Sequence, residues 1–255
     1  MADSREVAEA GALHDFELTM AFQPILDVEL GQPVAYEALV RGPNGEGAAA
    51  MLAQVTPETR YTFDQQCRVA AIECAVRAGI KETGARLSIN FMPDVITEPT
   101  EDSQRTLRAA RDTGFPPERL VFEFSEHDRL DAVHIASVIE AYHRLGFTTA
   151  FDDFGSGHAG LGHLSRFTPD FLKLDPQLVR GLCSSWSRRL VVENVIGLAH
   201  GLGIKVIAEG VETRDEYDKL RRLGVRYMQG YYIAQPAHGA LPRIAMSDFT
   251  GRAAA

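Results

Sequence analysis

Short apolar runs recur along the chain, and seven of them end on polar side chains that can bind a metal ion or a phosphate. The runs are AYEALVR, LSINF, RLVFEFSE, TTAFDDFG, FLKLD, KVIAEGVE and YMQGYY, and their polar residues are Glu37, Asn90, Glu123, Asp152 with Asp153, Lys173 with Asp175, Glu209 with Glu212, and Gln229. Apolar runs of this length predict buried strands. The pattern therefore predicts strands whose ends carry the chemistry of the protein.

One carboxylate beside an apolar run is usually a surface residue just past the end of a strand. Seven such ends in succession do not fit that interpretation. Carboxylates gathered at one end of a sheet repel one another, so they persist there only when cations neutralise them. Oxygen ligands of this kind suit Mg²⁺ and Mn²⁺. The pattern predicts a site for these ions at one end of a sheet.

Amphipathic segments separate the runs and predict helices, because their apolar residues lie three and four positions apart. Their ranges are 63–78, 103–111, 132–145, 188–202 and 214–223. Glycines after the helical segments are predicted to be left-handed C-caps, namely Gly79, Gly114, Gly146, Gly203 and Gly224. The strings HRLGFTTAFDD and HGLGIKVIAEG both join a helix end to a strand with an acidic tip. This repetition indicates successive βα units.

The number of strands predicts an α/β barrel. With AFQPILD around Phe22, and with the run at 34–39 counted once, the sequence gives eight strands, the number that closes a TIM barrel. The segment VELGQP between the first two is too short for a helical crossover, so these two strands should pair antiparallel. We expect a modified TIM (β/α)8 barrel with one antiparallel strand. An open doubly wound sheet is the alternative, but the chain lacks an early glycine-rich phosphate loop.

Composition fits one large domain that does not bind a polyanion. The 255 residues are 45% hydrophobic, which suffices for the core of a single barrel. The net charge of −9 argues against DNA as a ligand, because binding to duplex DNA needs a basic face. No apolar run reaches membrane-spanning length, and the N-terminal segment MADSREVAEAGALHD has no hydrophobic signal core. We therefore expect a cytoplasmic protein without a membrane partner.

The same patterning divides the chain into three parts. Residues 1–15 are predicted to be an N-terminal extension, 16–240 the barrel domain, and 241–255 a frayed tail, the loss of strand and helix patterning beginning near His238. The three cysteines, Cys67, Cys74 and Cys183, form neither a disulfide framework nor a Cys-x-x-Cys metal pair. Cys67 and Cys74 lie seven residues apart on one helix face and are predicted to pack in the core.

The strings YEALVRG, SIN, FEFSE, DDFGSG, LKLD, AEGVET and QGYYIAQP occur in this order over roughly residues 16–236. The ordered set resembles the EAL-domain family of cyclic di-GMP phosphodiesterases. The resemblance implies a TIM-like barrel that hydrolyses one phosphodiester bond of cyclic di-GMP to give linear pGpG, with Mg²⁺ or Mn²⁺ in a two-metal site. Ca²⁺ is expected to inhibit, because its larger and looser coordination alters the spacing needed for in-line attack.

The resemblance also implies a role for each site residue. The metal ligands would be Glu37, Asn90, Glu123, Asp152 and Asp153, with Asp152 bridging the two ions and Asp153 serving the second. The catalytic residues would be Glu209 beside the attacking water, Lys173 orienting that water, and Asp153. The substrate-binding residues would be Gln23, Leu39, Arg41, Gln229 and Pro236, and Glu126 and Glu212 would support the site.

Two other functions stay open at this stage. A catalytically weak EAL module would act as a cyclic di-GMP receptor or a protein-interaction domain, but such a module can lose the metal carboxylates that this chain keeps. A barrel enzyme with another metal-dependent substrate rests on analogy of fold alone.

EAL relatives often form homodimers through the region around the DDFG loop and the helix that follows, and the apolar residues of GHAGLGHLSRF are predicted to supply such a surface. Departures at His158, Ala159 and Gly160 put the stiffness of that loop in question. Met92, two residues after Asn90, resembles a subset of the family with an apolar residue there, often linked to sensory domains, which implies a sensory or effector protein partner.

Overall fold

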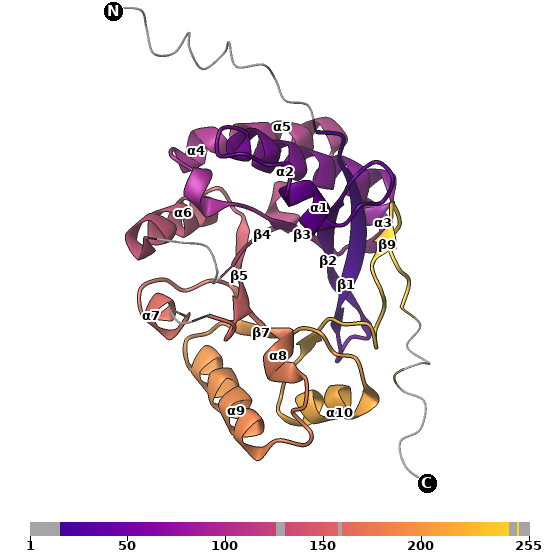
Figure 1. Cartoon of the computed structure of the whole chain (residues 1–255), viewed down its shortest axis with the longest axis vertical. Coiled ribbons are helices and arrows are strands. Elements are labelled where there is room, and N and C mark those ends of the chain that lie inside the picture. Colours follow the sequence, from indigo (N-terminus) through magenta and orange to yellow (C-terminus); the bar gives the residue numbers. More distant parts are fainter. Residues whose placement is uncertain (1–15, 126–130, 158–159, 245–248, 250–255) are drawn as a thin grey trace, which may run out of the picture.

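The computed structural model describes residues 16–125, 131–157, 160–244 and 249. Within these residues the strands form one sheet of nine, in the order β2-β3-β4-β5-β6-β7-β8-β1-β9, and β1 also pairs with β2, so the sheet closes into a barrel (Figure 1). The strands are β1 (Thr19–Asp27), β2 (Gln32–Arg41), β3 (Arg86–Asn90), β4 (Leu120–Ser125), β5 (Thr148–Phe154), β6 (Phe171–Leu174), β7 (Lys205–Ala208), β8 (Tyr227–Met228) and β9 (Ala237–His238). The N-terminal extension predicted at 1–15 lies outside the described residues.

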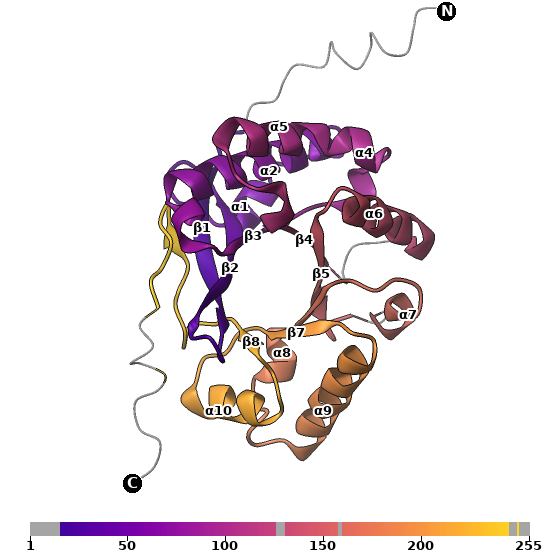
Figure 2. The ribbon, with the colours of Figure 1, turned by 180° about the vertical axis from the view of Figure 1, so that it is seen from behind.

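The helices lie around the outside of the barrel in both views (Figures 1 and 2). They are α1 (Ala48–Leu52), α2 (Arg60–Arg77), α3 (Ile80–Thr83), α4 (Pro99–Asp102), α5 (Gln104–Thr113), α6 (Ala132–Arg144), α7 (Gly160–Leu164), α8 (Pro176–Val179), α9 (Trp186–Gly201) and α10 (Arg214–Arg222), with 3₁₀ turns η1 (Pro93–Val95) and η2 (Pro117–Arg119). The five predicted helices correspond to α2, α5, α6, α9 and α10. All five predicted capping glycines have a positive φ, from 67° to 89°. No helix of the described part is both long and apolar enough to cross a membrane.

The first strand runs against its neighbours, as the short connection predicted. Strand β1 pairs antiparallel with β2 and with β8, whereas β2 to β8 pair in parallel. The connection between β1 and β2 is a tight turn in which the N–H of Gly31 donates to the carbonyl of Asp27 at 2.7 Å. The predicted barrel with one antiparallel strand is therefore confirmed.

The C-terminal segment adds a short strand to the predicted eight, and most of the tail predicted at 241–255, namely 245–248 and 250–255, lies outside the described residues. Strand β9 pairs with β1 at Ala21 and Phe22 and continues the edge that β8 covers at Leu26 and Asp27. Further along, the carbonyl of Pro242 accepts a hydrogen bond from the Tyr36 hydroxyl at 3.1 Å. The sequence did not reveal β9, because two residues are too few to show an alternating pattern.

An apolar layer lies inside the barrel. This layer consists of Ile25, Ala35, Val121, Ala150, Phe171 and Ile207, one residue from each of six strands. The larger core lies outside the barrel, between the strands and the helices, and includes the fully buried Phe22, Phe122 and Phe151. The inner layer supports whatever side chains project into the barrel one step further along the strands.

Candidate active site

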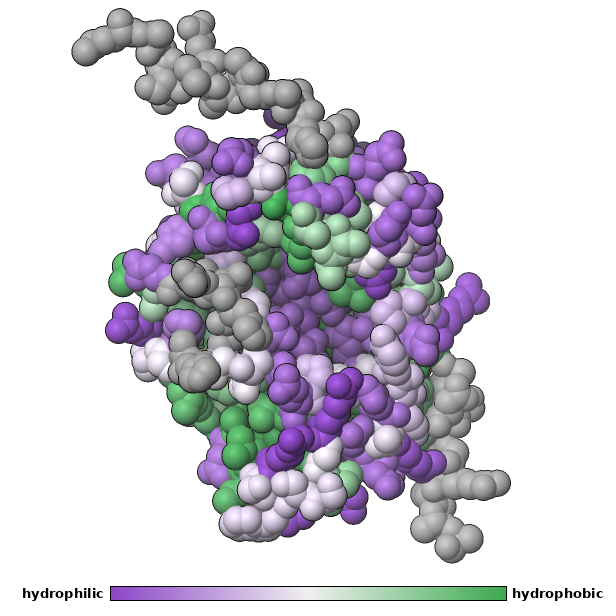
Figure 3. Space-filling view, in the orientation of Figure 1, coloured by the Kyte–Doolittle hydropathy of each residue, from purple (hydrophilic) through white to green (hydrophobic). Residues whose placement is uncertain are grey.

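The site forms the layer directly above this apolar layer. In a strand, residues two positions apart face the same side. The residues two positions after Ala35, Val121, Ala150, Phe171 and Ile207 are Glu37, Glu123, Asp152, Lys173 and Glu209. Since β2 and β4 to β7 run in parallel, all five side chains meet at the carboxyl end of the barrel. Figure 3 shows a hydrophilic hollow in the middle of this face.

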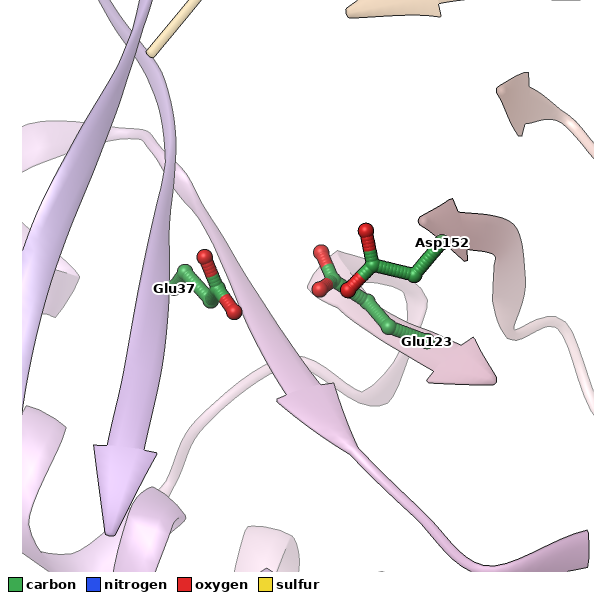
Figure 4. Close-up of side chains that lie close together, drawn as sticks. All are labelled: Glu37, Glu123 and Asp152. Atoms are coloured by element: carbon green, nitrogen blue, oxygen red, sulfur yellow. The ribbon is translucent and has the colours of Figure 1, made fainter. Parts of the chain in front are cut away.

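One buried lysine lies among four of the carboxylates. The Lys173 ammonium is 2.6 Å from Glu123 Oε2, 2.8 Å from Glu209 Oε1, 3.1 Å from Asp152 Oδ2 and 3.6 Å from Glu37 Oε2. Figure 4 shows the carboxylates of Glu37, Glu123 and Asp152 directed toward one another from three different strands. One positive charge against four negative charges leaves the site with an excess of negative charge.

This imbalance changes the acidity of the buried groups. Burial, reinforced by Glu37 and Asp152 and only partly offset by Lys173, raises the pKa of Glu123 to about 8. Burial together with the nearby charge of Asp152 likewise raises the pKa of Glu209 well above its ordinary value. Burial alone would lower the pKa of Lys173, but the surrounding carboxylates outweigh it and raise that pKa, so the lysine stays charged. Glu123 and Glu209 therefore keep their protons more readily than exposed carboxyl groups do, unless cations replace those protons.

The carboxylates form two groups that share one residue. Ligand atoms of Glu37, Glu123 and Asp152 lie within 4.8 Å of one another, and so do those of Asp152, Asp153 and Glu209. Asn90 adjoins the first group, because its Nδ2 donates to Glu37 Oε1 at 3.0 Å. Carboxylate and amide oxygens are hard donors that fit Mg²⁺ or Mn²⁺ rather than a zinc site built from His and Cys. The donor set fits two cations that share Asp152.

A break in β5 explains how two consecutive aspartates reach one site. Adjacent residues of a regular strand point to opposite faces, so Asp152 and Asp153 could not both face the barrel interior. The register between β5 and β6 shifts between Phe151 and Phe154, and Asp153 has a φ of 54°. Its N–H donates to Asp152 Oδ1 at 2.8 Å, and Ser125 Oγ donates to its Oδ2 at 3.0 Å. A strained, left-handed residue held by such contacts is typical of functional sites.

Several polar neighbours fix the ligands in place. Gln229 Nε2 donates to Glu37 Oε2 at 2.7 Å and to Gln23 Oε1 at 3.1 Å, while Gln23 Nε2 donates to the carbonyl of Ala234 at 3.1 Å. The Ser88 hydroxyl donates to Glu123 Oε1. Sequence analysis missed Ser88 and Ser125. The signal was available, because they lie two residues before Asn90 and two after Glu123 and so share the inward face.

Two cavities flank Glu37. The first has a volume of about 360 Å³ and a mostly apolar lining that includes Leu39, Asn90 and Met92. The second has a volume of about 240 Å³ and is lined by Gln23, Gln229, Glu209, Glu212 and Tyr231, among others. Glu37 lines both cavities, so they meet the site at this carboxylate.

The remaining predicted residues lie at different distances from this centre. Arg41 ends β2, where its Nη1 donates to the carbonyl of Val40 at 2.9 Å, and neither cavity includes it or the half-buried Pro236. Glu212 is exposed and pairs with Arg180 at 2.5 Å. Arg180 also lines the second cavity and was missed, because no pattern marks an arginine in a loop. Glu126 lies outside the described residues.

A barrel with one reversed strand and a carboxylate-rich rim of this kind defines the class of the protein. The chain belongs to the EAL domain family, which matches residues 5–236. It is 30% identical over 249 residues to the probable cyclic di-GMP phosphodiesterase PdeN of Escherichia coli, with 92% of this chain and 46% of PdeN covered. The chain thus spans about half the length of this relative.

Solved structures of other proteins are similar to the chain. One is a standalone EAL protein of Vibrio cholerae in its c-di-GMP bound form, with 42% identity, a TM-score of 0.88, and 93% of this chain and 99% of that chain covered. Another is BlrP1 of Klebsiella pneumoniae. Its manganese and cyclic di-GMP complex at pH 9.0 has 29% identity and a TM-score of 0.84, with 92% and 59% covered. A calcium complex of BlrP1 has 30% identity and a TM-score of 0.81, with 89% and 58% covered.

Proposed function

We propose that this chain hydrolyses one phosphodiester bond of cyclic di-GMP and releases linear pGpG, with two Mg²⁺ or Mn²⁺ ions bound. The observation that carries the proposal is the pair of acidic groups that share Asp152 at the carboxyl end of the barrel. Relatives named as cyclic di-GMP phosphodiesterases, and similar structures with cyclic di-GMP bound, support the choice of substrate.

Glu37, Asn90, Glu123 and Asp152 would hold the first ion, and Asp152 and Asp153 the second. When bound, the two ions would neutralise charge that grows on the phosphate oxygens and make the attacking water more acidic. The Asp153 conformation matters for this assignment, because the left-handed backbone turns a second carboxylate toward the site.

Glu209 and Lys173 act on the water. Glu209 lies on the side of the site next to Asp152 and Asp153, so its ionised carboxylate could accept a proton from a water held there. Lys173 has three N–H donors on a fully buried ammonium held by carboxylates from four strands. When bound ions draw these carboxylates toward themselves, an N–H of Lys173 would become available to orient a water molecule toward the phosphorus.

The nucleotide would lie across Glu37, with one guanylyl arm in each cavity. Leu39 lines the first cavity and offers apolar contact to a base, while Gln23 and Gln229 line the second. Arg41 would bind a phosphate, since its bond to the Val40 carbonyl uses one of the five donors of a fork that suits two phosphate oxygens. Pro236 and Glu212 would border the second arm.

The test is incubation of purified protein with cyclic di-GMP and Mg²⁺ or Mn²⁺, followed by chromatography, with Glu37→Ala as the inactive control. We expect pGpG from the wild type and at most a tenth of its turnover from the variant, because the variant lacks one ligand of the first ion. Substituting Ca²⁺ should inhibit hydrolysis. Binding of cyclic di-GMP without pGpG in either Mg²⁺ or Mn²⁺ would favour the receptor function instead, and equal turnover in Ca²⁺ and Mg²⁺ would contradict the expected role of ion size.

We also propose that the chain forms a homodimer through α7 and α9. Leu161 on α7 and Trp186 and Leu190 on α9 are exposed by 64%, 67% and 41%, and the two helices are neighbours around the barrel in both views. Trp186 and Leu190 lie one turn apart, so they share a helix face. Light scattering at tens of micromolar should show a dimer for the wild type and a monomer for Trp186→Ser. A monomeric, fully active wild type would contradict the proposal.

A further inference from the structure

A second buried ionic cluster lies outside the barrel, between α2, α6 and the strands that carry Asn90 and Glu123. Arg68 Nη2 is 2.6 Å from Asp64 Oδ2, and Arg68 Nη1 donates to the Tyr142 hydroxyl at 2.8 Å. Arg68 and Tyr142 are fully buried, and Asp64 is 2% exposed. An ion pair removed from water often adds no more stability than apolar packing of the same volume would. Its contacts therefore matter more than its contribution to the free energy of unfolding.

Arg68 contacts the outer faces of two strand ends that carry site residues. Its guanidinium lies over the rings of Phe91 and Phe122, at 5.2 Å and 5.5 Å from the ring centroids. These rings are the chain neighbours of Asn90 and Glu123, which face each other across β3 and β4. The N–H of Phe91 also donates to the carbonyl of Glu123 at 3.0 Å. One planar cation thus contacts both strands behind the two inward-facing residues.

Asp64 holds the chain just beyond the end of β3. Its Oδ1 accepts a hydrogen bond from the N–H of Met92 at 2.8 Å, two residues after Asn90. Asp64, Asn90 and Met92 all line the first cavity. The ion pair therefore fixes the end of β3 twice, through the Phe91 ring and through the Met92 backbone.

We propose that Asp64 and Arg68 are positioning residues that fix Asn90 and Glu123 and thereby set the affinity of the first metal ion. The proposal rests on the function proposed above. It extends that function, because neither residue faces the carboxylate layer inside the barrel. Outer contacts that orient metal ligands typically change metal affinity by about 10 to 100 times when they are removed.

The test compares Arg68→Met and Arg68→Lys with a matched control, Arg60→Met, in the full chain. Arg60 is on the same helix, and its Nη2 is 2.8 Å from Asp94 Oδ2, two residues past Met92, but this pair is at the surface. Mn²⁺ affinity would be measured by calorimetry on ion-stripped protein, with thermal melts by circular dichroism. Turnover of cyclic di-GMP would be followed as a function of Mn²⁺ concentration.

We expect both Arg68 variants to bind the tighter Mn²⁺ at least about tenfold more weakly, and to need correspondingly more Mn²⁺ for half-maximal turnover. At saturating Mn²⁺ their kcat should return to within about threefold of wild type, because the catalytic groups are intact. Arg60→Met should match the wild type throughout. Lysine keeps the charge beside Asp64 but lacks the planar group that contacts both rings, so Arg68→Lys serves if Arg68→Met does not fold.

If the Arg68 variants fold and bind Mn²⁺ with the affinity of wild type, the positioning role is overturned and the proposed function is not. Failure of both variants to fold would also overturn the positioning role, since the pair would then serve the stability of the barrel. A wild type that binds no Mn²⁺ would overturn the proposed function, and the inference with it.

Discussion

The two ends of the barrel differ in how many cations accompany their carboxylates. At the carboxyl end, four carboxylates lie around the ammonium of Lys173. At the other end, the carboxylate of Asp27 is paired with the guanidinium of Arg226. Its Oδ2 accepts hydrogen bonds from Arg226 Nε at 2.9 Å and Nη2 at 2.7 Å, and its Oδ1 accepts from the N–H groups of Glu29 and Leu30. Arg226 also pairs with Glu29, whose Oε2 is 2.9 Å from its Nη1, so one arginine faces two carboxylates here, whereas one lysine faces four at the other end.

Strand direction explains this difference. Asp27 ends β1, the one reversed strand, so its carboxylate lies at the end opposite the site. An acidic strand tip is therefore not sufficient to mark a site. The shortage of cations around the carboxylates is the better criterion. It also predicts that the stability contributed by Glu123 and the stability contributed by Asp27 change in opposite directions with pH. The raised pKa of Glu123 means that its stabilising contribution is fully present below about 4.5 and is lost as pH rises through about 8. Asp27 has a lowered pKa, so its contribution is lost in acid.

The largest effect on stability is expected from Lys173→Met. Removing the ammonium leaves four buried carboxylates without their nearest cation, and breaking a buried ionic group costs about 3 to 5 kcal/mol in the free energy of unfolding. Mn²⁺ should restore a large part of that loss, because added cations take over the charge balance. Urea unfolding with EDTA and with Mn²⁺ measures both quantities. A loss that Mn²⁺ does not change would contradict the charge imbalance as its cause.

The next effect concerns turnover. Asp153→Asn should lower hydrolysis in Mg²⁺ by at least roughly a hundredfold, a rise of about 2.7 kcal/mol in the barrier, because a neutral amide weakens the second acidic group. Cyclic di-GMP binding in Ca²⁺ should stay near that of wild type, since Glu37, Asn90, Glu123 and Arg41 are unchanged. Calorimetry measures the binding in Ca²⁺, and chromatography measures the hydrolysis in Mg²⁺. Loss of binding and turnover together would mean that Asp153 holds the loop through Ser125 instead.

Strand alternation made much of the fold and site predictable. The sequence predicted eight strands, the reversed pairing of the first two, the five long helices and the rim of carboxylates, because each is expressed in local spacing. The five site residues at two-residue offsets from Ala35, Val121, Ala150, Phe171 and Ile207 follow from the same period. The two-residue period of a strand and the length of a turn are local properties of the sequence. In a barrel they determine which side chains face the interior and which strands pair antiparallel.

Features set by tertiary contact were not predictable. The left-handed Asp153 depends on the register shift between β5 and β6, and β9 depends on the edge of β1 that β8 leaves uncovered. In the sequence, Arg68 is an ordinary polar position on an amphipathic helix, and its contacts with Phe91 and Phe122 exist only in the folded structure. None of these contacts leaves a periodic signal in the chain.

A smaller loss of stability is expected for Asp27→Asn, at the end of the barrel that holds Arg226. The amide keeps an acceptor for the backbone N–H groups of Glu29 and Leu30 but removes one of the two carboxylates that pair with Arg226, a change worth about 1 to 2 kcal/mol in the free energy of unfolding. The loss should be the same with EDTA and with Mn²⁺, and turnover should equal that of wild type. A Mn²⁺-dependent loss would mean that the two ends are coupled.

The smallest effect is the acid dependence of that same pair. Burial alone would raise the pKa of Asp27, but the hydrogen bonds from Arg226 and from the N–H groups of Leu30 and Glu29 outweigh it and lower the pKa below its ordinary 3.8. A carboxylate with a lowered pKa stabilises the fold above the unfolded pKa and loses that contribution as pH falls through the folded one. The difference in Tm between wild type and Asp27→Asn should therefore be constant from about pH 7 to 5, at about 2 to 4 °C, and shrink below pH 4. Thermal melts of both proteins across this range measure it. A difference that grows in acid would show that Asp27 is not ionised in the folded protein, and the two ends would then not differ in charge balance as described.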